Sequence, residues 1–298
     1  MLGANGQVGW ELQRTLAPLG EITALGRAEL DLAKTDMLRE SVQQHAPNVI
    51  VNAAGYTAVD KAESEPDLAM KVNSDAVSVL AQEADKSGAL LVHYSTDYVF
   101  DGEKTGAYTE EDEAKPLSAY GRTKLSGERA IHASGCRHLI FRTSWVYGAH
   151  GSNFPKTIFR LAKEREELSI VDDQVGAPTS AELLANVTAS CLECVAHSPP
   201  HQPFMGHGIY HVSPSGYTSW HGYAAFVVET AAELGARLKL SADKIHPISS
   251  REYAAPATRP GNSRLATDKL KAVFALDMPH WKSHLQPFIA QLAAADAR

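Results

Sequence analysis

The sequence predicts an α/β fold in which a doubly wound parallel sheet is combined with a smaller C-terminal lobe. First, short apolar runs alternate with helical runs through the first half of the chain, a pattern typical of parallel sheets. Second, a glycine-rich turn at residues 3–9 leads into the first helical run. Third, the apolar run that starts at Leu90 predicts a buried strand, and it ends with the hydroxyl residues Ser95 and Thr96.

The elements of the first half follow in order. Strands are expected at residues 21–25, 49–52, 90–95 and 138–143, where the chain is apolar over short stretches. Helices are expected at residues 7–19, 35–45, 67–86 and 119–132. Strands that alternate with helices in this way form βαβ units, so one parallel sheet with helices on its faces is predicted.

The second half of the chain is less regular. A strand near 169–171 precedes a helix from Ala181, and residues 208–212 are expected to return as a late strand of the same sheet. Helices are expected near 217–234 and 281–294, and the proline-rich segment 198–203 predicts an exposed loop. We therefore expect residues 1–148 to form the sheet domain and residues 149–298 mainly to form a lobe over its carboxyl edge.

The beginning of the chain departs from this pattern. Only Met1 and Leu2 precede Gly3, whereas a first strand typically has about five residues and lies at the middle of such a sheet. Buried ladder groups without partners cost about 1–3 kcal/mol each. We therefore expect that the sequence begins several residues late and that the natural protein carries a short apolar run upstream.

The glycine-rich turn and a Tyr-x-x-x-Lys pair point to chemistry. Glycines 3, 6 and 9 let the backbone approach a pyrophosphate at a helix N-terminus, although a plain turn would use the same residues. Tyr120 and Lys124 are four residues apart and share a helix face. Tyrosine has a pKa of about 10, and a neighbouring ammonium lowers that pKa toward neutral pH, where proton transfer is efficient. Together with the strand-end hydroxyls, these features favour a nucleotide-dependent enzyme.

Composition limits the other function classes. The chain has 298 residues, 44% of them hydrophobic, and a net charge of −7, which argues against nonspecific nucleic-acid binding. It contains no signal peptide and no apolar run as long as a membrane span, so no membrane partner and a cytoplasmic location are expected. Three cysteines make no disulfide framework. Cys191 and Cys194, followed by His197 and His201, continue a helical pattern, so we expect packing rather than metal or redox use.

The residues that carry a family resemblance extend over almost the whole chain. They are residues 6–12, 51–54, 57–63, 95–100, 120–124, 141–147, 173–179 and 259–265. These segments resemble the extended short-chain dehydrogenase/reductases, and most closely the family of dTDP-4-dehydrorhamnose reductases. The resemblance implies a Rossmann-type fold and NAD(P)H-dependent reduction of a dTDP-4-keto-6-deoxy sugar, the last step of dTDP-L-rhamnose synthesis.

The resemblance also assigns site residues. Catalysis is expected from Tyr120 as proton donor, Lys124 as the group that tunes it and holds the nicotinamide ribose, and Thr96 as a hydrogen-bond donor to the carbonyl oxygen. Thr96, Asp97 and Trp145 are the expected substrate contacts. The residues expected to bind the cofactor are Gly3, Gly6, Gln7, Val8, Arg27, Asp31, Leu32, Gly55, Tyr56, Thr57, Tyr120 and Lys124.

The cofactor preference follows from the residues after the second expected strand. An acidic residue there selects the ribose 2′-hydroxyl of NAD, whereas an arginine accommodates the 2′-phosphate of NADP. This chain has Arg27 and no carboxylate before Glu29. We therefore expect NADPH as the cofactor, with NADH also accepted.

Several alternatives remain open from the sequence. Dehydratases of the same scaffold carry Thr-Asp-Glu where this chain has Thr96-Asp97-Tyr98, which argues against a dehydratase or epimerase. A non-catalytic nucleotide-binding regulatory subunit would not need Tyr120, Lys124 and Thr96 together. Anion contacts could come from Lys124, Arg142, Arg259 or Arg264. His93 is expected to be a packed strand histidine, and Asn153 a helix N-cap rather than, with Lys156, a nucleotide contact.

The oligomeric state is a further expectation from the resemblance. Some members of the family form homodimers bridged by a divalent cation such as Mg²⁺, and Glu182 matches one ligand position. Gln291, however, stands where the partner carboxylate is expected, which argues against a metal bridge.

Overall fold

The computed structural model describes residues 1–198 and 204–296. Four parallel strands form the central sheet in the order β1 (Val49–Asn52), β2 (Leu90–Thr96), β3 (His138–Thr143) and β8 (Gly208–His211). Their side chains are almost all buried, as expected for a sheet covered on both faces. The four strands predicted in these places are confirmed. Most of the expected loop at 198–203, with His201, lies outside the described residues.

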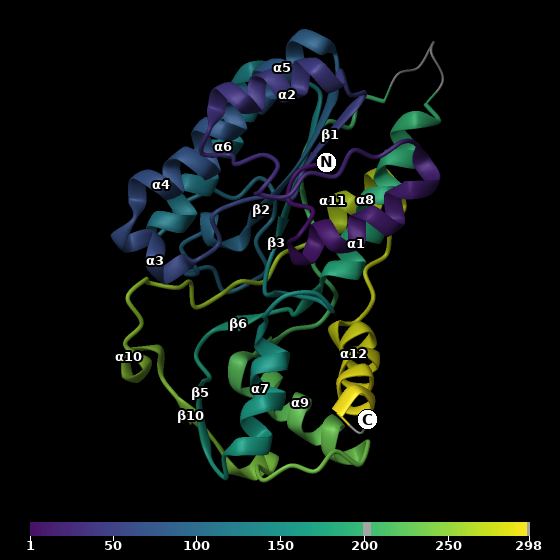
Figure 1. Cartoon of the computed structure of the whole chain (residues 1–298). Coiled ribbons are helices and arrows are strands. Elements are labelled where there is room, and N and C mark those ends of the chain that lie inside the picture. The colour runs from purple at the N-terminus through teal and green to yellow at the C-terminus, as the bar shows by residue number, and fades with distance from the viewer. Residues whose placement is uncertain (199–203, 297–298) are drawn as a thin grey trace.

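Helices cover both faces of the sheet (Figure 1). On one face, α2 (Thr35–His45), α5 (Ala76–Ser87) and α6 (Ala119–Ser134) bury side chains against Ile50, Leu91 and Ile140. On the other face, α1 (Gln7–Leu16), α8 (Ala181–Ala196) and α11 (Asp268–Phe274) pack against Val51, Val92 and Phe141. This three-layer arrangement confirms the doubly wound α/β fold.

The expected strand at 21–25 is wrong. Only Leu25 pairs, through a parallel bridge to Leu2, and Leu2 in turn bridges Asn52 at the end of β1. Met1 and Leu2 therefore lie between residue 25 and the main sheet, with the Leu25 amide donating to the Met1 carbonyl at 2.9 Å. A two-residue neighbour can form one bridge but not a ladder, so residues 21–24 stay irregular. The expectation about an upstream run stays a prediction.

Two predicted helices are divided. The expected helix 7–19 is α1 followed by a 3₁₀ turn, η1 (Ala17–Leu19), because Pro18 has no amide hydrogen to continue the α-helix. The expected helix 67–86 is α4 (Pro66–Met70), a π-helical turn η2 (Lys71–Asp75) and α5. The wider turn places Asn73 beside the loop after β1, where its side chain donates to the Tyr56 carbonyl at 3.0 Å and to Thr123 Oγ1 at 3.1 Å.

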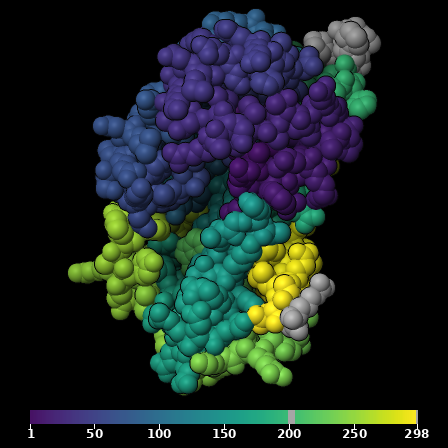
Figure 2. Space-filling view, in the orientation of Figure 1, coloured from purple at the N-terminus to yellow at the C-terminus, as the bar shows by residue number. Residues whose placement is uncertain are grey.

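The C-terminal lobe has its own core. Helices α7 (Phe154–Glu164), α9 (Trp220–Glu233) and α12 (Trp281–Asp296) enclose one apolar cluster with the parallel pair β5 (Leu168–Val171) and β10 (Ile245–Ile248). In the space-filling view the N-terminal part forms the upper mass and this lobe the lower one (Figure 2). Because α8, β8 and α11 pack with the central sheet, residues after 148 contribute to both parts. The domain boundary at 148 stays a prediction.

Short elements connect the two parts at the carboxyl edge of the sheet. They are α3 (Val59–Ser64), η3 (Asp97–Val99), β4 (Val146–Tyr147), β6 (Val175–Gly176), β7 (Thr179–Ser180), β9 (Thr218–Ser219) and α10 (Ser250–Tyr253), whereas η4 (Ala242–Lys244) packs in the second lobe before β10. β4 pairs with β7, and β6 pairs with β9. Within the described residues, no helix is both long and apolar enough to cross a membrane.

Candidate functional site

Thr96 and Asp97 lie buried where β2 ends and η3 begins. The Thr96 hydroxyl accepts a hydrogen bond from the Tyr98 amide at 3.1 Å and donates to Asp97 Oδ1 at 3.0 Å. These bonds fix both side chains at the carboxyl edge of the sheet, which is where open α/β folds bind their ligands.

The first turn of α6 brings Tyr120 to the same place. Ser118 caps the helix by accepting from the Gly121 amide at 3.1 Å. A Cβ atom on Gly121 would lie 2.2 Å from the Tyr98 carbonyl oxygen, so only glycine allows this close approach of the helix to η3. The rings of Tyr98 and Tyr120 meet edge to face at 5.7 Å. The structure thus brings Tyr120 and Thr96 together.

The environment of Tyr120 raises the pKa of its phenol. Burial raises its pKa to about 12, a hydrogen bond with Thr96 acts in the opposite direction, and the nearby Asp97 charge adds to the rise. At neutral pH the phenol therefore keeps its proton and can act as a donor.

Lys124 does not lower the pKa of Tyr120 here, contrary to the sequence expectation. Its amine turns toward β2, where it donates to the Tyr94 carbonyl at 2.6 Å and lies 3.1 Å from His93 Nε2. Burial lowers the pKa of Lys124 to about 8, and the charge of Glu128 acts against that shift. The helix spacing puts Tyr120 and Lys124 on one face, but the long lysine side chain finds nearer partners on the strand.

Asp97 presents an unsatisfied oxygen at the site. Burial raises the pKa of this carboxyl to about 6, whereas hydrogen bonds from Ser263 and Thr96 act to lower it. Its Oδ2 atom is buried and has no hydrogen-bond partner in the described part of the chain. A buried acceptor without a partner is costly, so a hydroxyl group of a bound molecule would be favoured there.

Trp145 lies two residues beyond the end of β3, at the same edge of the sheet. Its indole stacks on that of Trp220 with the ring centres 3.8 Å apart, and a Cβ on Gly176 would lie 2.8 Å from it. The side chain is half-buried at the boundary of the second lobe. Its assignment as a substrate contact stays a prediction.

The glycine-rich turn fits a dinucleotide. Gly3 has a φ of +83°, and a Cβ there would lie 2.7 Å from the backbone of Ala53. A Cβ on Gly9 would lie 2.0 Å from the Gly3 carbonyl oxygen, so helix and turn could not pack this closely with any other residue. Gly6 is the N-cap of α1 and makes no side-chain cap, which leaves the amides of Gln7 and Val8 free to bind an anion.

The side chain of Gln7 has a different role. Its amide nitrogen donates to the Val146 carbonyl at 3.4 Å, and its oxygen accepts from Asn153 at 3.0 Å. Asn153 is the predicted N-cap of α7, because its side chain also accepts from the Lys156 amide at 3.2 Å. Only the backbone of Gln7 is therefore available to a pyrophosphate.

The remaining predicted cofactor residues lie around this turn. Arg27 is 81% exposed and approaches Asp31 only to 3.9 Å, so its guanidinium can reach a phosphate. The side chain of Leu32 packs in the core. Gly55 and Thr57 are exposed on the loop that follows β1.

Tyr56 is held on that loop by two partners. Its amide donates to Asn73 at 2.8 Å, and its hydroxyl donates to Glu65 at 2.8 Å. These bonds fix the loop beside the turn at Gly3, because Ala53 and Ala54 lie directly against that glycine.

Of the four cations considered for an anionic ligand, Arg259 is the best placed. Arg142 is ruled out because it is buried in an ion pair with Glu128 at 2.6 Å. Arg264 donates to Asn262 at 2.8 Å and to a backbone carbonyl. Arg259 pairs with the half-exposed Asp60 at 2.7 Å, and its charge acts to lower the pKa of Tyr98, next to Tyr120.

The residues of the two metal-related patterns that the structure describes do not come together, and His201 lies outside the described residues. Glu182 is exposed and lies 3.7 Å from Arg14 and 4.0 Å from His284. Across residues 1–198 and 204–296, no group of three or more potential metal ligands comes together. Cys191 is buried in α8, where burial raises its pKa, and Cys194 is exposed.

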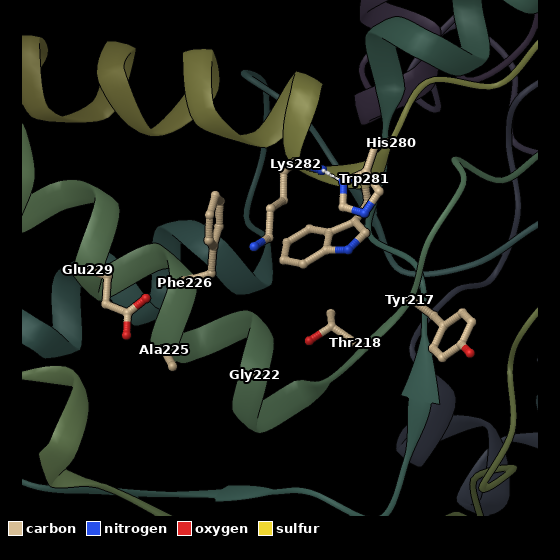
Figure 3. A pocket seen from close by; sticks show the side chains of 9 residues that line it. All are labelled: Tyr217, Thr218, Gly222, Ala225, Phe226, Glu229, His280, Trp281 and Lys282. Carbon is tan, nitrogen blue, oxygen red and sulfur yellow. Dashed lines mark hydrogen bonds between the residues drawn. The ribbon is translucent and has the colours of Figure 1, made fainter.

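A cavity of about 350 Å³ lies away from these residues, between α9 and the start of α12 (Figure 3). Its lining includes Phe226, Glu229, Trp281 and Lys282. The Lys282 ammonium already lies 4.7 Å from the ring centre of Phe226. None of the predicted site residues lines this cavity.

Sequence reasoning missed three residues of the site. Ser263 acts on the pKa of Asp97, His93 contacts Lys124, and Trp220 supports Trp145. For Ser263 a signal existed, because it belongs to the segment 259–265 that carries the family resemblance. The sequence predicts only a packing role for His93, and nothing in the pattern around Trp220 distinguishes it from a core aromatic residue.

Comparisons with known proteins identify the family of the chain. Residues 1–294 match the family described as the RmlD substrate binding domain. The chain is 46% identical to a dTDP-4-dehydrorhamnose reductase of Shigella flexneri, covering 100% of this chain and 98% of that relative. It is 47% identical to that of Burkholderia thailandensis, covering 94% of each chain.

Solved structures give the same result. A dTDP-4-dehydrorhamnose reductase of Clostridium acetobutylicum superposes with a TM-score of 0.88 at 36% identity, covering 98% of both chains. That of Bacillus anthracis, in complex with NADP, gives 0.87 at 36% identity over 97% of both. A dTDP-glucose 4,6-dehydratase of Streptomyces venezuelae, at 18% identity and a TM-score of 0.76, shares the fold alone.

Proposed function

The chain belongs to the RmlD substrate-binding-domain family of dTDP-4-dehydrorhamnose reductases, and we propose that Tyr120, Thr96 and Lys124 carry out its reaction. The activity is the NAD(P)H-dependent reduction of dTDP-4-dehydrorhamnose, the final step of dTDP-rhamnose synthesis. The single observation that supports the residue assignment is the half-buried Tyr120 phenol, placed beside Thr96 and Tyr98 at the carboxyl end of β2.

The cofactor site is proposed from the residues that fit a dinucleotide. The backbone of Gly3, Gly6, Gln7 and Val8 would hold the pyrophosphate at the start of α1, and Arg27 would bind the 2′-phosphate of NADPH. A bound reduced nicotinamide supplies the hydride to the sugar carbonyl carbon. Because Arg27 is exposed, its preference for the phosphate is moderate, and NADH is also accepted in this proposal.

The proton is proposed to come from Tyr120. A carbonyl that accepts a hydride becomes an alkoxide unless a proton arrives, and a phenol with a pKa of about 12 still holds its proton at pH 7. Thr96 would donate a hydrogen bond to the same oxygen and stabilise the developing charge. Lys124, whose amine points at β2 rather than at the phenol, would hold the nicotinamide ribose.

The sugar is proposed to lie between Asp97 and Trp145. The free Oδ2 atom of Asp97 would accept from a sugar hydroxyl, and the indole of Trp145 offers an apolar surface for the ring. Arg259 would pair with the diphosphate, for which it has to exchange its contact with Asp60.

The competing functions have less support. A dehydratase needs a carboxylate beside Asp97, where this chain carries Tyr98 with a pKa raised by burial. A regulatory binding subunit would leave the arrangement of Tyr120 and Thr96 without a purpose. We also propose a cytoplasmic location, supported by the unpaired cysteines Cys136, Cys191 and Cys194, and leave a homodimer as a proposal from the family.

The test is direct. Purified protein is mixed with enzymatically prepared dTDP-4-keto sugar and NADPH, and the loss of nicotinamide absorbance is followed together with the appearance of dTDP-L-rhamnose. A reductase consumes one NADPH for each product molecule. A different nucleotide sugar formed without net NADPH loss would point to an epimerase or dehydratase, and no reaction at all would point to a binding protein.

A further inference from the structure

Lys124 is the end of a buried chain of three side chains. Asn52 at the end of β1 stands opposite His93 of β2 in the sheet register, and its Nδ2 atom lies 3.1 Å from His93 Nδ1. The other ring nitrogen, Nε2, lies 3.1 Å from Lys124 Nζ. Asn52, His93 and Lys124 are 0%, 1% and 4% exposed, so hydrogen bonds within the chain are not replaced by bulk water.

The orientation of the Asn52 amide is fixed by the backbone. The Ala54 amide donates to Asn52 Oδ1 at 3.2 Å, so the oxygen must face the loop and the NH₂ group must face His93. An NH₂ group is only a donor, and His93 Nδ1 is therefore the acceptor. Burial, and secondly the charge of Lys124, lower the pKa of His93 well below its ordinary value. The neutral ring then carries its single proton on Nε2, which points at Lys124.

This arrangement distinguishes the two protonation states of Lys124. A neutral amine can accept a hydrogen bond from His93 Nε2–H while it donates to the Tyr94 carbonyl. An ammonium has only donors, so it cannot form a hydrogen bond with the Nε2–H group of His93. To accept from an ammonium, the imidazole must lose the proton at Nε2, gain one at Nδ1 and give up its bond to Asn52.

Other charged groups act on the same amine. Glu128, one turn further along α6, favours the ammonium, although it is already paired with Arg142. Asp97, directly after β2, and Tyr120, in the first turn of α6, lie at the carboxyl edge of the sheet. The imidazole of His93 therefore disfavours the ammonium form of Lys124, whereas Glu128 favours it.

We propose that His93 is a positioning residue for the reductase, holding the Lys124 amine and, through Asn52, linking its protonation state to the loop at residues 53–57. This inference rests on the proposed role of Lys124 in the reaction. It gives the strand histidine a task beyond packing. It also connects the catalytic lysine to the loop that is expected to line the cofactor, because Ala54 belongs to that loop.

The tautomer can be measured without any substitution. In protein labelled with ¹⁵N-histidine, long-range ¹H–¹⁵N spectra assign the proton of each neutral ring to Nδ1 or Nε2. We expect the His93 signals, identified by their loss in His93→Gln, to show the Nε2–H form. An Nδ1–H form at a pH above 9, where Lys124 is neutral, would overturn the proposal.

The coupling is tested from the far end of the chain. Asn52 does not touch Lys124, but Asn52→Ala frees His93 to adopt the other tautomer and accept from an ammonium. We expect the pKa of Lys124, read from ¹³Cε-lysine titrations and assigned with Lys124→Met, to rise by about half a unit or more. In the His93→Gln variant, the further substitution Asn52→Ala should not change the pKa of Lys124. His138→Gln, in a buried histidine of β3, is the control that leaves Lys124 unchanged.

The outcomes separate this inference from the proposed function. These spectra need no turnover, so they hold whether or not the protein reduces a sugar. If Asn52→Ala leaves the Lys124 titration in place while the circular dichroism spectrum is that of the wild type, the coupling does not exist. If that variant does not fold, the tautomer measurement on the wild type still decides.

Discussion

The indole of Trp145 stacks on that of Trp220 with an angle of 17° between the rings. Trp145 follows β3 at the carboxyl edge of the sheet, and Trp220 is the first residue of α9 in the second lobe. Trp145 has a φ of +49°, a left-handed conformation that costs a bulky residue about 1–3 kcal/mol. The stack therefore joins the two parts of the molecule and compensates for strain at a predicted substrate contact.

Substituting Trp220 should affect sugar binding through Trp145. In Trp220→Ala the indole of Trp145 loses its stacking partner, and we expect the KM for the dTDP-keto sugar to rise about three- to tenfold. Trp220→Phe keeps an aromatic face and should lie close to the wild type. Steady-state kinetics at saturating NADPH measure both variants. An equal rise in the KM for NADPH would instead indicate a general loss of structure.

Removing the phenolic hydroxyl tests the proton donor. Tyr120→Phe keeps the ring beside Tyr98 but has no proton to give, so kcat should fall by about a hundredfold or more. NADPH binding, measured by fluorescence titration, should be nearly unchanged. Tyr94→Phe is the matched control, since that buried hydroxyl bonds Thr188 on the other face of the sheet. Wild-type turnover in Tyr120→Phe would contradict the assignment.

The sheet could be predicted from the sequence because its signals are local. The runs at 49–52 and 138–143 each contain three consecutive large apolar residues, and the strands have the predicted bounds. The run at 21–25 looks similar but is not a strand, since a strand also depends on what lies beside it, and only Leu2 pairs with Leu25. The π-turn around Asn73 was not predicted for the same reason, because its partners Tyr56 and Thr123 are remote in sequence.

The sequence predicted which residues belong to the site better than it predicted what those residues contact. Spacing placed Tyr120 and Lys124 on one helix face, but spacing could not show that the lysine amine would turn to His93 and Tyr94. That choice depends on how α6 packs against β2. Likewise, the motif around Arg142 suggested an anion contact, whereas the fold buries it against Glu128.

The cofactor preference can be tested at Arg27. Its exposed guanidinium is the residue proposed to meet the 2′-phosphate, so Arg27→Ala should raise the KM for NADPH about three- to tenfold and leave that for NADH unchanged. High salt should reduce the difference between the two cofactors in the wild type, since an exposed pair is screened. Equal KM values for both cofactors in the wild type, unaffected by the substitution, would contradict this assignment.

The buried carboxyl of Asp97 should make stability depend on pH. Its pKa is about 6 in the folded protein and about 4 in an unfolded chain, so between these values the folded state binds more protons. The contribution of Asp97 to the free energy of unfolding therefore falls as the pH rises from 4 to 6. Above pH 6 the cost of the buried charge is fully present.

Asp97→Asn removes that charge and keeps the shape of the side chain. We expect the variant to be more stable than the wild type at pH 8, by on the order of 2 kcal/mol, with the difference vanishing below about pH 4. Urea unfolding at several pH values measures it. Asp101 is the control of opposite sign, because the Tyr108 hydroxyl and a backbone amide lower its pKa. Asp101→Asn should destabilise the protein at pH 7, and that loss should disappear on acidification. If the stability difference for Asp97→Asn does not change between pH 4 and pH 8, the carboxyl is not desolvated in the folded protein. The unpaired Oδ2 atom would then give no support to sugar binding at Asp97.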